Sequence, residues 1–291
     1  MSRYIYGIDF GTSNSALAIL DTTTSELVKV FSMPSILFFP AGGGEYKIGQ
    51  PAIDAYVESG MNGRFMKSIK KILANDRFRD TKIGSFRYRA EDLVRLVIGA
   101  LKEKADSFLG EDIRTAVIGR PVFFSEDPAK DALAQERLTL AAEAAGLDDC
   151  KYQYEPIGAA YTFERDLPGE TLVMVADFGG GTSDFSLMRL DPKRADMSDR
   201  KADMLAKGGL YVGGDSFDSA IMWERGTPHF GRGLKYQSQP GKWLPLPISF
   251  FQNICSWEKM NFFDSVKVRN EIEDYYHFTG KKEELLRLQA L

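Results

Sequence analysis

The sequence predicts a mixed α/β fold made of two related halves, because one short phrase occurs twice in it. The phrase reads Gly-Ile-Asp-Phe-Gly-Thr-Ser-Asn-Ser at residues 7–15 and Ala-Asp-Phe-Gly-Gly-Gly-Thr-Ser-Asp-Phe at 176–185, with Asp9 and Asp177 in equivalent places. Each copy lies between two apolar runs, so each predicts a strand, a tight turn and a second strand. Amphipathic stretches between the copies supply the helices.

The first half opens with strands and then an insertion. Strands are expected at residues 3–9, 16–20 and 27–32. A passage rich in proline and glycine follows from Pro34 and opens an inserted subdomain, about 34–110. Within it, residues 54–57 are expected to be helical. Residues 91–109 predict a longer helix, since their apolar side chains recur on one stripe.

A β–α unit closes the first half. Residues 113–118 predict a buried strand, 119–121 a turn, and 127–145 an alanine-rich helix with Gly146 as its C-cap. A further helix begins at Glu155, where Pro156 fits the first turn, and ends before Pro168. We therefore expect a first lobe over residues 1–168 and a second lobe over 169–291. The pattern of residues 281–291 is that of an amphipathic helix.

The composition is typical of a globular protein that buries a full core. The chain has 291 residues, of which 44% are hydrophobic and 27% charged, and a net charge of −4, which does not favour nucleic-acid binding. Its two cysteines lie far apart and outside any CxxC pattern, so neither a disulfide framework nor a zinc site is predicted. The sequence contains neither an export signal nor an apolar run of about 18 residues, so we expect no membrane span and a cytoplasmic location.

The two repeated loops have the composition of a phosphate-binding site. Glycines let the backbone approach a ligand, and successive N–H groups form a concave site for anions. Asp9 and Asp177, just ahead of the loops, can hold a hydrated Mg²⁺ that bridges phosphates to the protein. The alternative is a pair of ordinary hairpin turns, but the presence of both copies favours a clamp around a polyphosphate. No Walker A or GxGxxG pattern occurs, which argues against P-loop and Rossmann sites.

Two further segments fit such a site. At residues 208–218, glycine pairs lead into a polar helix start, where backbone amides and the helix dipole favour phosphate. The alternative there is a simple N-cap at Asp215 or Ser216. Glu155, at the start of its helix, can bind the metal through water or orient an attacking water, and it is equally an acid favoured by the dipole.

Five motifs, in order along the chain, resemble the ATPase domain of the seventy-kilodalton heat-shock chaperones. They read Ile8-Asp-Phe-Gly-Thr-Ser-Asn-Ser15, Ala116-Val-Ile-Gly-Arg-Pro-Val-Phe-Phe124, Glu155-Pro-Ile-Gly-Ala-Ala160, Asp177-Phe-Gly-Gly-Gly-Thr-Ser-Asp184 and Gly213-Gly-Asp-Ser-Phe-Asp218. The resemblance implies a two-lobed, actin-like ATPase fold of the ribonuclease H-like type. The family's adenosine-binding segments have no counterpart before Leu291. We therefore expect a short, divergent and truncated member with an incomplete second lobe and no peptide-binding domain.

The resemblance also implies roles for individual residues. Asp9 and Asp177 would position hydrated magnesium, and Lys70 would orient the attacking water, a role for which Lys67 is the other claimant. Glu155 and Asp184 would help to organise metal and water, and with Lys70 and Asp177 they form the predicted catalytic set. The predicted phosphate-binding residues are Gly11, Thr12, Ser13, Asn14, Gly179, Gly180, Gly181, Thr182, Gly213, Gly214 and Asp215.

The function implied is that of an ATP-binding and ATP-hydrolysing, chaperone-like protein that acts as a nucleotide-driven conformational switch. Its cofactors would be ATP or ADP and Mg²⁺. Its partners would be the nucleotide and protein clients or exchange factors, without nucleic acid or membrane. Two alternatives stay open: a nucleotide-sensing or protein-interaction module with little turnover, and a small-molecule kinase of the same superfamily.

Overall fold

The computed structural model describes residues 3–195, 200–256 and 266–277. The chain divides into two compact units, Met1–Gly213 and Gly214–Leu291. The first unit contains all but two of the predicted site residues, Gly214 and Asp215, which begin the second. The amphipathic helix predicted at 281–291 lies outside the described residues.

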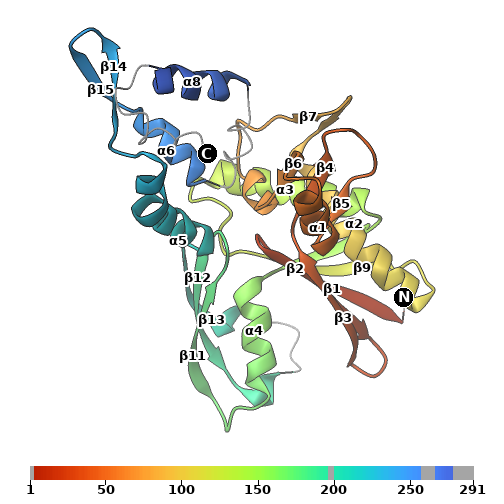
Figure 1. The fold of residues 1–291 in the computed structure, drawn as a ribbon. Helices are drawn as coiled ribbons and strands as arrows, with labels where there is room; N and C mark the ends of the chain where they lie inside the picture. Colours follow the sequence, from red (N-terminus) through yellow and green to blue (C-terminus); the bar gives the residue numbers. More distant parts are fainter. Residues whose placement is uncertain (1–2, 196–199, 257–265, 278–291) are drawn as a thin grey trace. The chain divides into compact units, whose positions relative to one another are not determined.

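A five-stranded mixed sheet forms the centre of the first unit (Figure 1). β1 pairs with β2 antiparallel and with β9 parallel, β9 pairs with β10 parallel, and β2 pairs with β3 antiparallel. The three strands predicted at the start of the chain are confirmed as β1, β2 and β3. The order across the sheet is β10 (Asp149–Tyr154), β9 (Thr115–Arg120), β1 (Tyr4–Phe10), β2 (Asn14–Asp21) and β3 (Glu26–Pro34).

The turn predicted at residues 119–121 is wrong, because β9 continues through Arg120. Gly119 pairs with Gln153, and Arg120 pairs with Tyr154. Both partners belong to β10, a strand that the sequence analysis did not predict. The neighbouring strand therefore keeps the backbone extended at a Gly-Arg-Pro phrase that would otherwise favour a turn.

Two long helices carry the main core of the first unit. α2 (Ala90–Leu109) packs on α3 (Pro128–Ala144) and on strands β2 and β3. Most of the predicted stripe of α2 is buried, including Leu93, Val97 and Leu101, but Phe108 near its end is 53% exposed. The chain leaves α3 through Gly146 at φ +88°, which agrees with the predicted helix end.

The segment between β3 and α2 forms two small sheets and a short helix. It also contains a 3₁₀ turn, η1 (Ile69–Ile72), which carries Lys70 and Lys71 and is followed by a loop. Its other elements are β4 (Leu37–Pro40), β5 (Lys47–Ile48), α1 (Gln50–Glu58), β6 (Gly63–Met66), β7 (Thr81–Ile83) and β8 (Phe86–Tyr88).

A separate three-stranded antiparallel sheet follows α4 (Glu155–Glu164). α4 lies alongside this sheet (Figure 1), and its Ile157 and Ala160 pack on Met188 and Leu190. The opposite face of the edge strand exposes Leu172, Met174 and Phe178. The strands are β11 (Thr171–Phe178), β12 (Ser183–Leu190) and β13 (Met204–Leu210), with the 3₁₀ turns η2 (Pro192–Arg194) and η3 (Lys201–Asp203) between the last two.

These two sheets fall on either side of residue 168, while the contact boundary between the compact units lies after Gly213. The lobe boundary at 168 stays a prediction. Over the described ranges, every helix is too short or too polar to cross a membrane.

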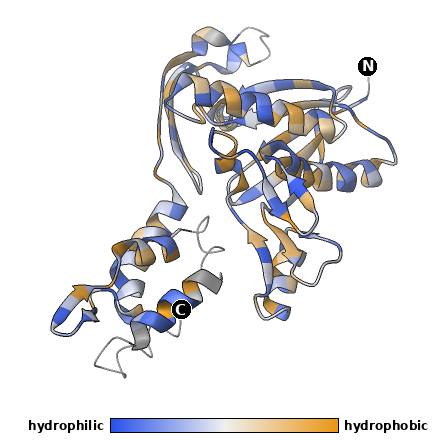
Figure 2. Ribbon diagram, turned by 90° about the horizontal axis from the view of Figure 1, so that it is seen from above, coloured by the Kyte–Doolittle hydropathy of each residue, from blue (hydrophilic) through white to orange (hydrophobic). Residues whose placement is uncertain are grey.

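The second unit has a small core of its own, built from Leu246, Phe250, Phe251, Ile254 and Ile272. Its helices carry both hydrophobic and hydrophilic residues (Figure 2), as expected for helices that bury one face and expose the other. Its elements are α5 (Gly214–Ile221), the π-helical turn η4 (Met222–Gly226), η5 (Thr227–Phe230), β14 (Lys235–Gln239), β15 (Lys242–Pro245), α6 (Ile248–Ile254) and α8 (Val266–His277).

The packing of α3 makes a direct stability prediction. Leu138 is 1% exposed, so Leu138→Ala is expected to lower the free energy of unfolding by about 2–5 kcal/mol through lost burial and a residual cavity. Leu140, on the same helix, is 42% exposed, and Leu140→Ala is expected to change that energy by at most about 0.5 kcal/mol. Urea unfolding followed by circular dichroism measures both variants. Equal losses would contradict the assigned buried face of α3.

Candidate functional site

The first repeated loop joins β1 to β2 and has a fixed backbone. A Cβ atom placed on Gly11 would overlap the carbonyl oxygen of Asn14, so the loop requires glycine there. Ser35 anchors the loop from outside. Its backbone amide donates to the carbonyl of Ser13 at 2.8 Å, and its hydroxyl donates to the carbonyl of Gly11 at 2.8 Å. The Ser35 hydroxyl also hydrogen-bonds the Ser15 hydroxyl at 2.7 Å.

The second loop joins β11 to β12 and lies against the first. The Gly179 amide donates to the Thr182 carbonyl at 2.9 Å, which closes the turn. A Cβ atom on Gly180 would overlap the hydroxyl of Ser13 and lie 3.4 Å from Thr12, so the two loops approach each other closely at this glycine. The structure therefore brings together the two copies of the phrase, which lie more than a hundred residues apart in the sequence.

A third glycine segment completes this convergence. A Cβ atom on Gly213 would lie 2.6 Å from the carbonyl oxygen of Gly179 and 2.8 Å from that of Gly180. The Ser183 hydroxyl donates to the carbonyl of Val212 at 2.6 Å, which holds this segment beside β12. Gly214 and Asp215 open α5 in the second unit, and their predicted roles stay predictions.

Asp177 and Asp184 face each other across β11 and β12, directly beside the second loop. Asp184 is 2% exposed and accepts hydrogen bonds from the Thr182 hydroxyl at 2.9 Å and from the Val122 amide at 3.3 Å. Burial raises the pKa of the Asp184 carboxyl, and these two donors oppose that rise. The side chain of Asp184 is thus fixed in position by two different segments of the chain.

Lys70 and Glu155 form a partly buried ion pair. The ammonium of Lys70 lies 2.6 Å from Oε1 of Glu155, and the two side chains are only 11% and 16% exposed. Gly119 makes room for the pair, since a Cβ atom there would lie 3.1 Å from Cγ of Glu155. Burial raises the pKa of Glu155, Lys70 opposes that rise, and the charges of Asp9 and Asp177 add to it.

Asp9, the last predicted acid, shares this electrostatic environment. Its side chain remains open to solvent, yet partial desolvation by the surrounding loops raises its pKa. Lys70 opposes that rise and Asp177 adds to it, so the two aspartates repel each other. A hydrated divalent cation would relieve this repulsion, and carboxylate oxygens are the ligands that Mg²⁺ prefers. The acids therefore fit the predicted site for magnesium bound through water.

In the part of the chain that the structure describes, no three His, Cys, Asp or Glu side chains are grouped closely enough to ligate a bare metal ion. The magnesium role of Asp9 and Asp177 stays a prediction. Thr12 lies at the contact between the loops, because its Oγ1 would be 3.1 Å from a Cβ atom on Gly181. Asn14 is exposed at the start of β2.

The sequence analysis missed Lys71 as a site residue. Its Cε would lie 3.0 Å from a Cβ atom on Gly181, so its side chain runs along the second glycine loop. The 3₁₀ geometry of η1 directs Lys70 toward Glu155 and its neighbour toward the loop. The adjacent lysines of the Ser-Ile-Lys-Lys phrase were the available signal for a second lysine at the site. The sequence analysis assigned only one lysine to this role and so left Lys71 out.

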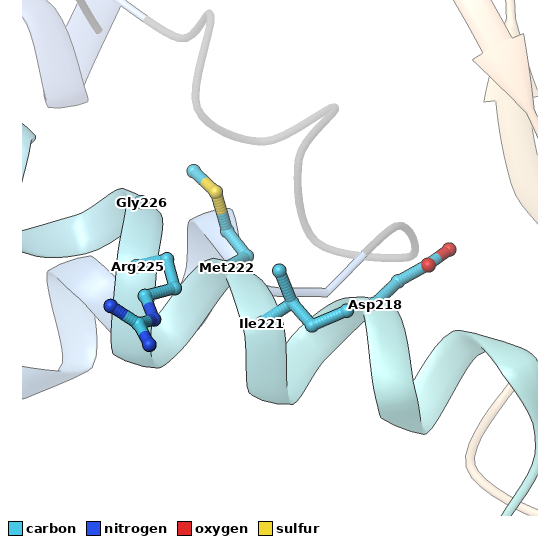
Figure 3. A pocket seen from close by; sticks show the side chains of 5 residues that line it. All are labelled: Asp218, Ile221, Met222, Arg225 and Gly226. Carbon is cyan, nitrogen blue, oxygen red and sulfur yellow. The ribbon is translucent and has the colours of Figure 1, made fainter.

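A pocket lies on the second unit, and one of its lining residues, Asp218, belongs to the five sequence motifs. It is open to solvent, encloses ≈ 410 Å³ and is lined by residues of α5 and η4 (Figure 3). One acid and one base flank an apolar floor. The lining residues are Asp218, Ile221, Met222, Arg225 and Gly226.

The mixed α/β fold, with two hairpin loops that meet beside a set of acids, is the arrangement of an actin-like ATPase domain, as the sequence predicts. The family model described as "Hsp70 protein" matches residues 5–225 of the chain. The chain is 32% identical over 230 residues to the chaperone protein DnaK of Thermosipho melanesiensis and 31% identical over 230 residues to that of Thermosipho africanus. Each match covers 76% of this chain and 35% of the relative.

The chain therefore belongs to the Hsp70 family, a family of nucleotide-binding chaperone ATPases. The family resemblance drawn from the five sequence motifs is confirmed. The chain spans about a third of the length of the curated relatives that it matches.

The geometry of the first loop predicts a strong difference between two glycines of β1 and its turn. Gly11→Ala is expected to lower the free energy of unfolding by about 1–3 kcal/mol, because the new methyl group would overlap backbone and force strain on the loop. Gly7→Ala is the matched control, since its Cβ atom would meet Ala18 at an ordinary 3.9 Å. Thermal unfolding compares the two. A Gly11→Ala variant as stable as Gly7→Ala would contradict the described loop.

Proposed function

We propose that this chain binds Mg²⁺-ATP between its two glycine loops and hydrolyses it to ADP and phosphate. The single observation that carries the proposal is the Lys70–Glu155 ion pair beside the meeting point of the loops. Phosphoryl transfer requires positioned cations and backbone donors that stabilise negative charge on the phosphate, and carboxylates that can hold the metal ion.

The glycine loops would hold the phosphate chain. Backbone N–H groups and the hydroxyls of Thr12, Ser13 and Thr182 would donate to phosphate oxygens, and Gly213 would complete the cradle. Asp9 and Asp177 would hold hydrated magnesium, which neutralises the charge that develops on the phosphate oxygens. The close fit of the loops implies that they part to admit the nucleotide and close again behind it.

Lys70 and Glu155 would act at the terminal phosphate. The Lys70 ammonium would orient the attacking water and stabilise negative charge, while Glu155 keeps that ammonium in position through their 2.6 Å contact. Asp184, fixed by Thr182 and Val122, would help to order water near the metal. The side chain of Lys71 along the second loop supplies a second cation for the phosphates.

Hydrolysis would serve as a conformational switch, with ATP closing and product release reopening the loops. By similarity to the relatives, which are named chaperone protein DnaK, protein clients or exchange factors are the proposed partners, and a cytoplasmic location is proposed. No role for nucleic acid or membrane is proposed.

A low-turnover module for nucleotide sensing or protein interaction is the second candidate. The exposed apolar face of β11, with Leu172 62%, Met174 69% and Phe178 69% exposed, favours contact with another protein surface. A small-molecule kinase of the same superfamily is a third candidate that no particular contact favours.

Phosphate release from Mg²⁺-ATP without an added acceptor tests the proposal. Lys70→Met and Glu155→Gln are each expected to slow release at saturating ATP by about a hundredfold or more, since each removes a positioned charge. Lys47→Met alters a lysine whose side chain is 43% exposed and pairs with Glu45, so it is the control and should leave the rate unchanged.

The other outcomes separate the candidates. Binding of ATP without phosphate release by the wild-type chain would reject hydrolysis in favour of the sensing module. Release that depends on a small-molecule acceptor would indicate a kinase.

A further inference from the structure

We infer that Arg137, on α3, is a positioning residue that fixes the lysine-bearing turn η1 at the proposed phosphate site. The inference rests on the proposed function for its catalytic consequence. It goes further by assigning a role to a residue outside all five motifs and on a helix that supplies no other proposed site residue.

The guanidinium of Arg137 donates four hydrogen bonds to backbone carbonyls of one short segment. Nη1 shares its two N–H groups among the carbonyls of Ile72 at 3.1 Å, Leu73 at 2.9 Å and Asn75 at 3.0 Å, so at least one of these N–H groups is bifurcated. Nη2 donates to the carbonyl of Phe78 at 2.9 Å. One side chain thus binds the carbonyl of the last residue of η1 and three carbonyls of the loop that follows it.

Arginine is suited to this task for a geometric reason. The last carbonyls of a short helical turn have no partner within the turn, and they point along its axis toward a region that favours positive charge. A planar guanidinium carries five N–H donors in a fixed fork, whereas a lysine ammonium carries three on a flexible stem. The contacts of Arg137 use only Nη1 and Nη2, so the difference from lysine lies in their fixed plane: a lysine ammonium at position 137 would not hold the four carbonyls in one arrangement.

The turn is also fixed at its beginning. Ser68, which precedes η1, has φ +60° in the left-handed region and is 1% exposed. Such a conformation costs energy for a residue with a side chain and persists only where the surroundings enforce it. Ile69 and Leu73 are buried in the main core, which holds the turn from below. Arg137 closes this set of restraints from the α3 side.

The two lysines lie between these restraints. Lys70 meets Glu155 at 2.6 Å, and Lys71 runs along the loop at Gly181. If the carbonyl end of the turn relaxes, both ammonium groups move. A misplacement of about 1 Å in a catalytic group can cost about a hundredfold in rate. Because Lys70 is assigned to the terminal phosphate, which ADP lacks, binding of ADP should depend on Arg137 much less than hydrolysis of ATP does.

The test compares Arg137→Met and Arg137→Lys with a control on the same helix, Lys130→Met. The side chain of Lys130 is 39% exposed, and its ammonium contacts the Asp76 carboxylate of the same loop at 3.6 Å. Three quantities are measured: amide hydrogen exchange of residues 69–78 without nucleotide, phosphate release at saturating Mg²⁺-ATP, and affinity for Mg²⁺-ADP.

Arg137→Met is expected to raise exchange in residues 69–78 selectively and to slow phosphate release at least tenfold, with ADP affinity within about threefold of wild type. Arg137→Lys should lie between Met and wild type, and Lys130→Met should match wild type in all three measurements. Exchange that stays unchanged in Arg137→Met would overturn the inference that Arg137 holds η1 and the loop after it in place.

Two other results bear on the inference in different ways. A faster-exchanging turn with an unchanged rate, or parallel losses of ADP affinity and rate, would reduce Arg137 to a stabilising residue and overturn the positioning role. A wild-type chain that releases no phosphate would overturn the proposed function and the catalytic part of the inference together. The exchange result would still decide whether Arg137 holds residues 69–78 in place.

Discussion

The candidate site depends on the approach of three backbone segments at distances that leave no room for side chains. A Cβ atom on Gly180 would meet the Ser13 hydroxyl of the first loop, and one on Gly213 would meet the backbone of the second, while Gly11 is required by the turn of its own loop. Glycine at positions 180 and 213 lets these segments approach one another closely, and glycine loops of this kind can offer backbone N–H groups to an anion. The acids and the lysines lie on different helices and strands, and the convergence of the loops brings them to one site.

The carboxylates at the site outnumber the lysines, so the positions of the lysines matter for the electrostatics. Burial raises the pKa of Glu155 and Asp184, and the proximity of Asp177 adds to the rise for both. Lys70 opposes these shifts, so its location is an electrostatic requirement of the folded chain as well as a proposed catalytic one. Restraints on both ends of η1, from Ser68 and from Arg137, are a structural solution to that requirement.

Much of this arrangement could be predicted from the sequence, because the repeated phrase is local. A run of glycine and hydroxyl residues between apolar strands specifies a hairpin, and the pairing of Asp177 with Asp184 follows from it. Features that arise from distant backbone could not be predicted in this way. β10 mixes polar and apolar residues and is defined by its partner β9, and the carbonyls gathered by Arg137 leave no signature in side-chain sequence.

The most direct test of a phosphate site at the meeting of the glycine segments is calorimetric titration with Mg²⁺-ATP of the wild-type chain, Gly213→Ala and Gly208→Ala. A Cβ atom on Gly208 meets nothing within 4 Å, so this variant controls for the substitution itself. The account predicts binding by the wild type, equal affinity within about twofold for Gly208→Ala, and at least about tenfold weaker binding for Gly213→Ala, or about 1.4 kcal/mol. A folded wild-type chain that binds no ATP, or a Gly213→Ala variant that binds as tightly as wild type, would contradict it.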